Sequence, residues 1–179
     1  IELAQDGQDH ERAEALDRVR KEANRMTMLV SELLQLTRLE GDPSAVVRKV
    51  VRIDQLLDEV AGDCDLEAEA RDVEIDLQIE RAVTLNGEAE LLRRAFENIT
   101  RNAIRHAPPK TRVELRLSLR ESDVTVSIRD HGPGVPQDYL EKIFRPFFRV
   151  DDDRSRTSGG VGLGLAIAHR AIGLHQGRI

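Results

Sequence analysis

Two glycine-rich stretches constrain the fold of this chain more than any other feature. The first, Asp130–Gly134, reads Asp-His-Gly-Pro-Gly and directly follows a stretch in which apolar and polar residues alternate, as in a half-buried strand. The second, Gly160–Gly164, reads Gly-Val-Gly-Leu-Gly and directly precedes an apolar stretch with a helical pattern. The chain therefore places a tight turn after a strand and a glycine-rich turn before a helix.

Elsewhere the sequence alternates between the periods of strands and of helices. We expect strands over 46–51, Val73–Ile79, Ala82–Asn86, Val113–Leu119 and Val124–Ile128, and helices over Ile53–Arg71, Glu88–His106, Tyr139–Phe144 and Gly162–His175. The strand over Ala82–Asn86 is expected to pair with Val73–Ile79, and Leu66 to lie on the apolar face of its helix. Since strands and helices mix and two hairpin strands dominate the sheet, we expect an α+β fold, a two-layer α/β sandwich.

Residues 13–40 carry an apolar residue at alternating steps of three and four, which predicts a long helix. The repeat consists of Leu16, Val19, Ala23, Met26, Val30, Leu33 and Thr37. Leu29 and Leu36 widen this stripe, which suits a helix bundle better than a two-stranded seam, although a plain coiled coil fits the same repeat. Because Gly41–Ser44 ends the helix, we expect a helical segment over 1–41, a linker over 42–45 and a compact domain over 46–179.

The composition excludes several classes of protein. A net charge of -6 gives no overall attraction to nucleic acid. The single cysteine, Cys64, rules out an internal disulfide and a cysteine-rich zinc site. No apolar run approaches the ~18 residues that a membrane-spanning helix needs. We therefore expect a globular segment that lies outside the bilayer and has no nucleic acid partner.

The glycine run Gly160–Gly164 could bind phosphate, because the start of a helix presents free N–H groups and the positive end of the helix dipole. It is not a dinucleotide fingerprint, because Leu165 stands where the third glycine is required. It is not a P-loop either, because Leu165-Ala166 follow in place of Lys-Ser/Thr. A flexible loop that leads into a helix is the alternative interpretation.

Polar side chains on the helix over Glu88–His106 suggest a second element of the same site. Asn98 and Asn102 lie one helical turn apart and face the same way, and Arg105 and His106 follow one turn later. An asparagine carbonyl is a suitable Mg²⁺ ligand, and an arginine can neutralise phosphate charge. The alternative is an ordinary solvated helix face.

The turn that opens with Asp130 suggests a third element. Its carboxylate could accept a hydrogen bond from an adenine amino group in an otherwise apolar pocket. Gly132 and Gly134 would then let the backbone come close to the base. The alternative is a Pro-Gly turn without a ligand.

In this order, the stretches resemble the nucleotide pocket of the gyrase/chaperone/histidine-kinase/MutL ATP-binding superfamily, and most closely that of a sensor histidine kinase. Asn98–Asn102 resembles the N box, Asp130–Gly134 the first glycine box, Phe144–Arg149 the F box and Gly160–Gly164 the second glycine box. The resemblance covers about residues 45–179. It implies the Bergerat-type ATP-binding fold, with ATP and Mg²⁺ as cofactors.

The resemblance also implies roles for individual residues. Asn98 and Arg149 would be catalytic, and Asn102, alone or together with Asn98, would hold Mg²⁺. The loop from Arg149 to Gly159 would be the ATP lid, which Phe144 and Phe147 anchor. The residues implied in ATP binding are Asn98, Asn102, Arg105, His106, Asp130, Gly132, Gly134, Phe144, Phe147, Arg149, Gly160, Gly162, Leu163 and Gly164.

The helix that ends at Glu40 resembles the second helix of the dimerisation and histidine-phosphotransfer hairpin of membrane-anchored, envelope-sensing bacterial kinases. The resemblance implies a homodimer through this hairpin, and a response regulator receiver domain as the phosphoryl acceptor downstream. It also implies a place on the cytoplasmic side of the bacterial inner membrane, with any membrane contact made by segments outside this chain. The family's acceptor histidine motif is absent, and we interpret His10 as a surface residue near a helix end. The family's final strand beyond Ile179 is also missing, and Gln176 stands where a glycine is more usual.

The expected function is therefore that of a histidine kinase fragment, which transfers a phosphoryl group from ATP to a protein histidine. An ATPase of the gyrase or chaperone kind is the first alternative, but it would need a glutamate at the place that Asn98 occupies, and Glu97 lies off that face. A serine-kinase anti-sigma factor shares the pocket but has no need of the heptad helix. A dimerisation module or degenerate pseudokinase is the non-enzyme alternative, and the intact Asn102, Asp130 and glycine boxes argue against it.

Overall fold

The computed structural model describes residues 47–121, 123–150 and 161–179, together with positions 12, 15–20, 22, 23, 26, 27, 29–31, 33 and 34 of an N-terminal helical segment. The predictions for His10, for the linker 42–45, for Gly160 and for residues 151–159 of the lid lie outside the described residues. The domain boundaries drawn from the sequence thus remain predictions.

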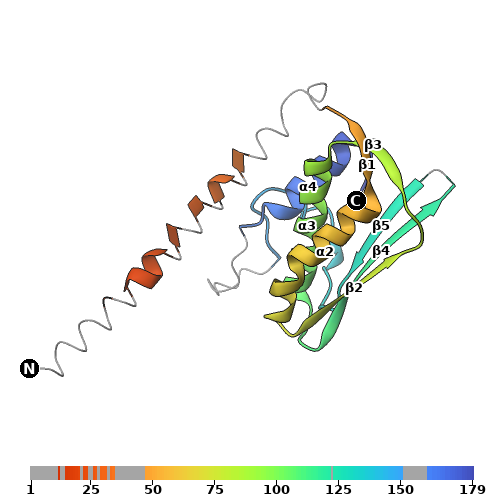
Figure 1. Cartoon of the computed structure of the whole chain (residues 1–179). Helices are drawn as coiled ribbons and strands as arrows, with labels where there is room; N and C mark the ends of the chain where they lie inside the picture. Colours follow the sequence, from red (N-terminus) through yellow and green to blue (C-terminus); the bar gives the residue numbers. More distant parts are fainter. Residues whose placement is uncertain are drawn as a thin grey trace, which may run out of the picture.

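The elements follow one another in the order β1 (Lys49–Arg52), α2 (Ile53–Glu69), β2 (Val73–Ile79), β3 (Thr84–Gly87), α3 (Ala89–His106), β4 (Thr111–Arg120), β5 (Asp123–Arg129), η2 (Gln137–Tyr139) and α4 (Gly164–Leu174). Strands β2, β4 and β5 form a three-stranded sheet in which β2 runs parallel and β5 antiparallel to β4. The helices lie together on one side of this sheet (Figure 1). This arrangement confirms the expected α+β sandwich.

The core lies between this sheet and helices α2 and α3. Val113, Leu115 and Leu117 of β4 are fully buried, and so are Leu57 and Val60 of α2. Burial of each such side chain contributes about 1.5–3 kcal/mol relative to an exposed one. The alternation of β4 thus directs its apolar residues towards the helices and leaves its charged residues on the outer face of the sheet.

Helix α3 begins where the sequence predicts, because Glu88 caps its N-terminus. The Glu88 carboxylate accepts hydrogen bonds from the backbone N–H groups of Glu90 (3.2 Å) and Leu91 (2.7 Å). A buried stripe runs along the helix through Leu92, Phe96 and Ile104. This stripe fixes the rotation of α3 and leaves its asparagines off the core side.

The predicted partner of β3 is wrong. Strand β3 pairs antiparallel with β1, with Val51 opposite Leu85, and does not pair with β2. The junction of β1 and α2 explains this, because Ile53 N–H donates to the Val83 carbonyl (2.9 Å) and Asp54 Oδ1 accepts from Val83 N–H (3.2 Å). Both bonds hold Val83, just before β3, against the start of α2, and so place β3 beside β1.

Two further predictions are wrong in part. Leu66 was expected on the apolar face of α2, but it is 79% exposed. The helix expected over Tyr139–Phe144 is limited to the single turn η2, followed by turns such as that closed by Lys142 N–H and the Tyr139 carbonyl (2.8 Å). Short apolar stretches carry too few residues to distinguish a helix from a series of turns.

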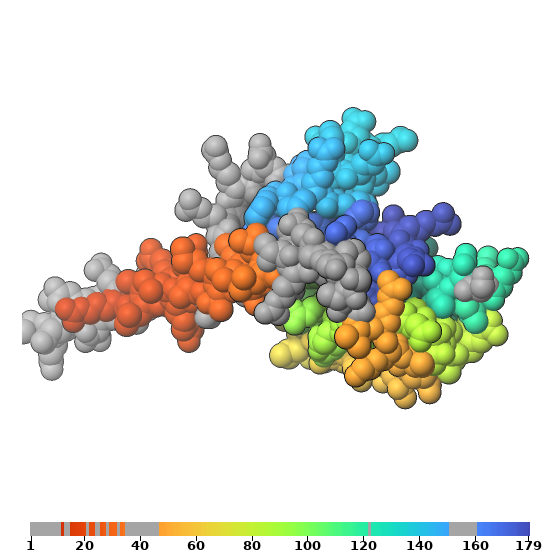
Figure 2. All heavy atoms as spheres, turned by 90° about the horizontal axis from the view of Figure 1, so that it is seen from above, coloured from red at the N-terminus to blue at the C-terminus, as the bar shows by residue number. Residues whose placement is uncertain are grey.

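The described turns of the N-terminal segment are helical and extend as an arm from the α/β body (Figure 1). Most of its apolar residues are exposed, with Leu16 at 70% and Val30 at 58%. Leu29 differs, because it packs against an apolar cluster of Leu163, Ile167 and Leu174. Figure 2 shows the orange end of the arm against the blue C-terminal part of the body. Among the described residues, no helix is long and apolar enough to cross a membrane.

Candidate nucleotide-binding site

The first part of the site is the contact between α3 and the start of α4. A Cβ atom on Gly164 would lie 3.1 Å from Asn98 Oδ1, so the Asn98 amide faces the first residue of α4. Among the described residues no side chain caps α4, whose N-cap residue is the apolar Leu163. The first N–H groups of α4 are therefore available to an anionic ligand beside Asn98.

The second part joins the F box to the second glycine box through backbone contacts. Phe147 N–H donates to the Gly162 carbonyl (2.9 Å), and a Cβ atom on Gly162 would lie 2.8 Å from the Phe148 carbonyl oxygen. Gly162 has φ +80° and Phe147 has φ 65°, so both lie in the left-handed region. Only glycine fits at position 162, and the φ of Phe147 is strained for an aromatic residue.

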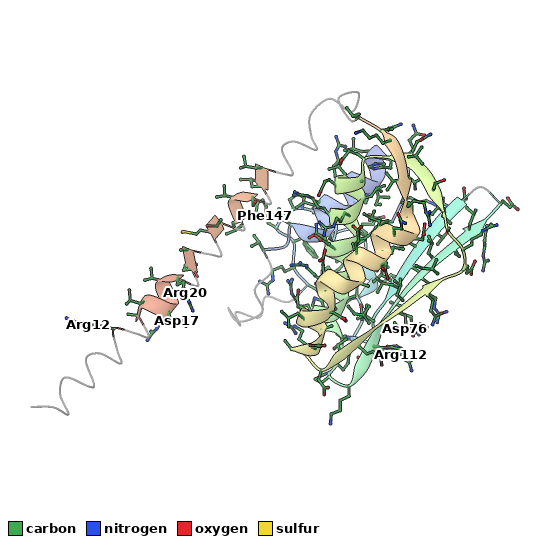
Figure 3. All side chains as sticks on the ribbon, in the orientation of Figure 1. Arg12, Asp17, Arg20, Asp76, Arg112 and Phe147 are labelled. Carbon is green, nitrogen blue, oxygen red and sulfur yellow. The ribbon has the colours of Figure 1, made fainter. Side chains whose placement is uncertain are left out.

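The aromatic residues of the F box have different environments. Phe144 packs against His169 of α4, with ring centroids 5.1 Å apart, and Phe148 packs against Tyr139 (5.6 Å). Phe147 is 59% exposed (Figure 3). Phe144 thus anchors this segment by its side chain, whereas Phe147 contributes through its backbone.

The third part is the turn after β5. Asp130 Oδ1 accepts a hydrogen bond from Gly132 N–H (2.7 Å), and its Oδ2 has no partner among the described residues. A Cβ atom on Gly132 would lie 2.5 Å from the His106 carbonyl oxygen, so this turn packs against the last residue of α3. Gly134 adopts φ +73°, which favours glycine.

These contacts place the start of α4 and the Asp130 turn along one helix, α3. Asn98, at the middle of α3, meets α4, and His106, at its end, meets the Asp130 turn. Asn102 and Arg105 lie between them on α3 and are half-buried. Arg149 is exposed at the end of the F box, and Gly160 lies outside the described residues.

Sequence reasoning missed His175, which connects α4 to the start of α3. Its Nε2 accepts a hydrogen bond from Glu88 N–H (2.9 Å), so Nδ1 carries the proton and donates to the Ala171 carbonyl (2.7 Å). Nothing in the residues around His175 indicates a partner 87 positions earlier in the chain. Cys64 has no place in the site, and burial raises the pKa of its thiol.

Comparison with known proteins defines the class to which this fold and site belong. Residues 87–179 match the family described as "Histidine kinase-, DNA gyrase B-, and HSP90-like ATPase". This match covers more than half of the chain, and the chain belongs to this family. Membership implies ATP as the nucleotide and confirms the expected resemblance.

Individual relatives narrow the class to sensor histidine kinases. The sensor histidine kinase CpxA of Escherichia coli (strain K12) is 36% identical in an alignment 171 residues long, which covers 90% of this chain and 35% of CpxA. The mycobacterial sensor histidine kinase MprB has a TM-score of 0.64 at 27% identity, over 73% of this chain and 81% of that chain. Full-length ShkA in complex with AMPPNP has a TM-score of 0.74 at 29% identity, over 87% of this chain and 32% of that chain. The chain thus corresponds to the catalytic ATP-binding part of sensor histidine kinases and spans about a third of the length of the curated relatives it matches.

Proposed function

We propose that this chain binds Mg²⁺–ATP and transfers the γ-phosphoryl group to a histidine of a dimerisation helix, for onward relay to a response regulator. The single observation that carries the proposal is the double contact of α3, with α4 at Asn98 and with the Asp130 turn at His106. Their separation along the helix is ~12 Å at about 1.5 Å per residue. An extended nucleotide can span such a distance, with its base at Asp130 and its phosphates at the start of α4.

In this proposal each part of the site has one task. Asp130 accepts a hydrogen bond from the adenine amino group through Oδ2, while Gly132 and Gly134 keep the backbone open to the base. Leu163 and the second glycine box, Gly160, Gly162 and Gly164, form the phosphate-binding turn. Arg105 and Arg149 bring positive charge towards the phosphates, and His106 lines the pocket beside the Asp130 turn. Phe144 and Phe147 hold the base of the lid.

Magnesium fits the residues that α3 presents. No group of three His, Cys, Asp or Glu side chains gathers to hold a metal ion in the described part of the chain. An amide oxygen together with phosphate and water oxygens is the donor set that Mg²⁺ accepts in nucleotide sites. Asn102, alone or with Asn98, would hold the ion, which neutralises charge on the phosphates.

Transfer to a protein is favoured over hydrolysis by the position of Glu97. A carboxylate that activates water would have to stand where Asn98 faces Gly164. The Glu97 carboxylate instead lies 3.8 Å from Arg93, which also pairs with Asp63 of α2. Because Glu97 is directed towards α2, the described site has no general base beside the start of α4, and catalysis rests on positioning and electrostatics.

The N-terminal helix supports a homodimer as the active assembly. Its exposed apolar repeat, with Leu33 at 45% and Met26 at 61%, needs a partner surface. We assign residues 1–41 to the C-terminal part of the dimerisation hairpin, 42–45 to a linker and 46–179 to the catalytic domain. The acceptor histidine and any membrane anchor would belong to segments outside this chain, with the domain on the cytoplasmic side of the bacterial inner membrane.

Radiolabelled ATP tests the transfer step. The chain alone should remain unlabelled, because no histidine of the described residues is placed as an acceptor in line with the phosphates. Adding the missing first helix, in cis or on a partner chain, should restore acid-labile, base-stable labelling of that helix, and Asn102→Ala should abolish it. Label on the chain alone that disappears with His10→Gln would show that His10 is the acceptor and contradict the assignment.

A further inference from the structure

The turn that carries Asp130 is also held from the outer face of the sheet. His131 Nε2 lies 3.3 Å from Glu114 Oε1 of β4, and Arg116 Nη2 donates to Glu114 Oε2 (2.7 Å). Glu114 stands opposite Arg129 in the pairing of β4 with β5, and Arg129 directly precedes Asp130. The three side chains thus form a chain of contacts that ends on the residue next to Asp130.

Glu114 is enclosed to an unusual degree for a charged residue on this face. Its side chain is 13% exposed, whereas the nearby pair of Asp76 and Arg112, 3.9 Å apart, is 27% and 59% exposed (Figure 3). An enclosed carboxylate loses water and needs donors to replace it. Arg116 satisfies one oxygen and His131 faces the other, where Nε2–H donates in the protonated ring or in the Nε2–H tautomer of the neutral ring.

The same turn is confined on its other side. Gly132 N–H is bonded to Asp130 Oδ1, and Gly132 lies against the His106 carbonyl at the end of α3. Residues 130–132 are therefore fixed between α3 on one side and β4 on the other. His131 makes the side-chain contact with β4, whereas the Asp130 carboxylate is engaged with Gly132 N–H.

We propose that Glu114 and His131 are positioning residues for the recognition of adenine by Asp130. The inference rests on the proposed ATP site and adds two residues to it: Glu114, which lies outside the motifs, and His131, which lies within the first glycine box but has no role assigned so far. Holding His131 restricts the backbone of the turn and so directs Asp130 Oδ2 before the nucleotide arrives. Such preorganisation raises affinity by lowering the entropy lost on binding.

The test measures the affinity of purified chains for Mg²⁺–AMPPNP and for Mg²⁺–tripolyphosphate, which has no base. His131→Leu and Glu114→Gln should each weaken AMPPNP by about three- to tenfold and leave tripolyphosphate unchanged. The double variant should lose no more AMPPNP affinity than the single variant with the larger loss, because both residues act through one contact. His131→Gln, which keeps a side-chain N–H donor, should recover most of the affinity.

Asp76→Asn is the matched control, since it breaks an ion pair on the same face without touching the turn, and its affinities should equal those of the parent chain. Thermal unfolding of each variant reports whether the fold persists. Unchanged AMPPNP affinity of folded His131→Leu, or an equal loss for tripolyphosphate, would overturn the inference and leave the proposed function standing. Failure of the parent chain to bind AMPPNP would overturn both.

Discussion

At the scale of single residues, Thr100 is buried in the core, and its Oγ1 has no hydrogen-bond partner among the residues that the structure describes. Thr100 is 0% exposed. An unsatisfied buried hydroxyl destabilises a fold, whereas a methyl group of the same shape does not. We expect Thr100→Val to leave the free energy of unfolding unchanged or to raise it by about 1 kcal/mol in urea denaturation.

Thr111→Val is the matched control, because the Thr111 hydroxyl donates to the Pro108 carbonyl (2.6 Å). Thr111→Val should lower the free energy of unfolding by about 0.5–1.5 kcal/mol. If Thr100→Val were the less stable of the two, the Thr100 hydroxyl would have a partner and the description of the core around α3 would be wrong.

Asp54 makes stability depend on pH in the acid range. Hydrogen bonding from Arg52, opposed by desolvation and supported by Val83 N–H, lowers the pKa of this carboxyl from 3.8 to about 2. Because the folded-state pKa lies below the unfolded value, the stabilisation is fully present above about pH 4 and is lost as the pH falls towards 2. We expect the free energy of unfolding of Asp54→Asn to fall less between about pH 4 and pH 2 than that of the parent chain. Urea denaturation at a series of pH values measures this.

Asp58→Asn, an exposed change on the same helix, serves as the control and should keep the pH profile of the parent chain. A parent-like acid profile for Asp54→Asn would contradict the assigned role of the Arg52–Asp54–Val83 contacts.

At the scale of elements, the junction of the F box and α4 depends on Gly162. Any other residue at this position would have to adopt a φ of +80°, and its Cβ atom would lie 2.8 Å from the Phe148 carbonyl oxygen. We expect Gly162→Ala to cost about 1–3 kcal/mol of stability and to weaken AMPPNP binding, because the phosphate-binding turn must shift.

Gly173→Ala, near the C-terminal end of α4, is the control. A Cβ atom at Gly173 meets nothing within 4 Å, so alanine should raise stability by up to about 1 kcal/mol without changing affinity. Equal effects of the two substitutions, measured by thermal unfolding and calorimetry, would contradict the close approach at Gly162.

The elements also show which parts of the fold could be predicted from the sequence. Strand β2 and helix α3 were predicted almost to the residue, because β2 alternates strictly and α3 has a capping glutamate and a long apolar stripe. The partner of β3 was not predictable, since its four residues carry little pattern and the bonds at Val83 arise from the β1–α2 junction. The motifs predicted Asp130 and Asn98 as site residues by order and spacing, whereas the contacts of Glu114 and His175 come from distant parts of the chain that only the fold brings together.

At the scale of the whole molecule, the exposed stripe of the N-terminal helix predicts self-association. Leu33→Glu places a charge in this stripe and should shift the chain towards monomer in sedimentation velocity. Arg20→Ala is the control, because the exposed pair of Arg20 with Asp17 contributes little. A parent chain that remains monomeric at high concentration would contradict the hairpin assignment and leave the nucleotide site intact.

The central claim is that one site, built on α3, binds ATP through Asp130. Isothermal titration calorimetry of the folded chain with Mg²⁺–AMPPNP tests it most directly. The parent chain should bind one nucleotide per chain, and Asp130→Asn should weaken binding by about 1–3 kcal/mol because an amide donor would face the adenine amino group. Well-folded parent protein that binds no nucleotide, or an Asp130→Asn variant with undiminished affinity, would contradict the account.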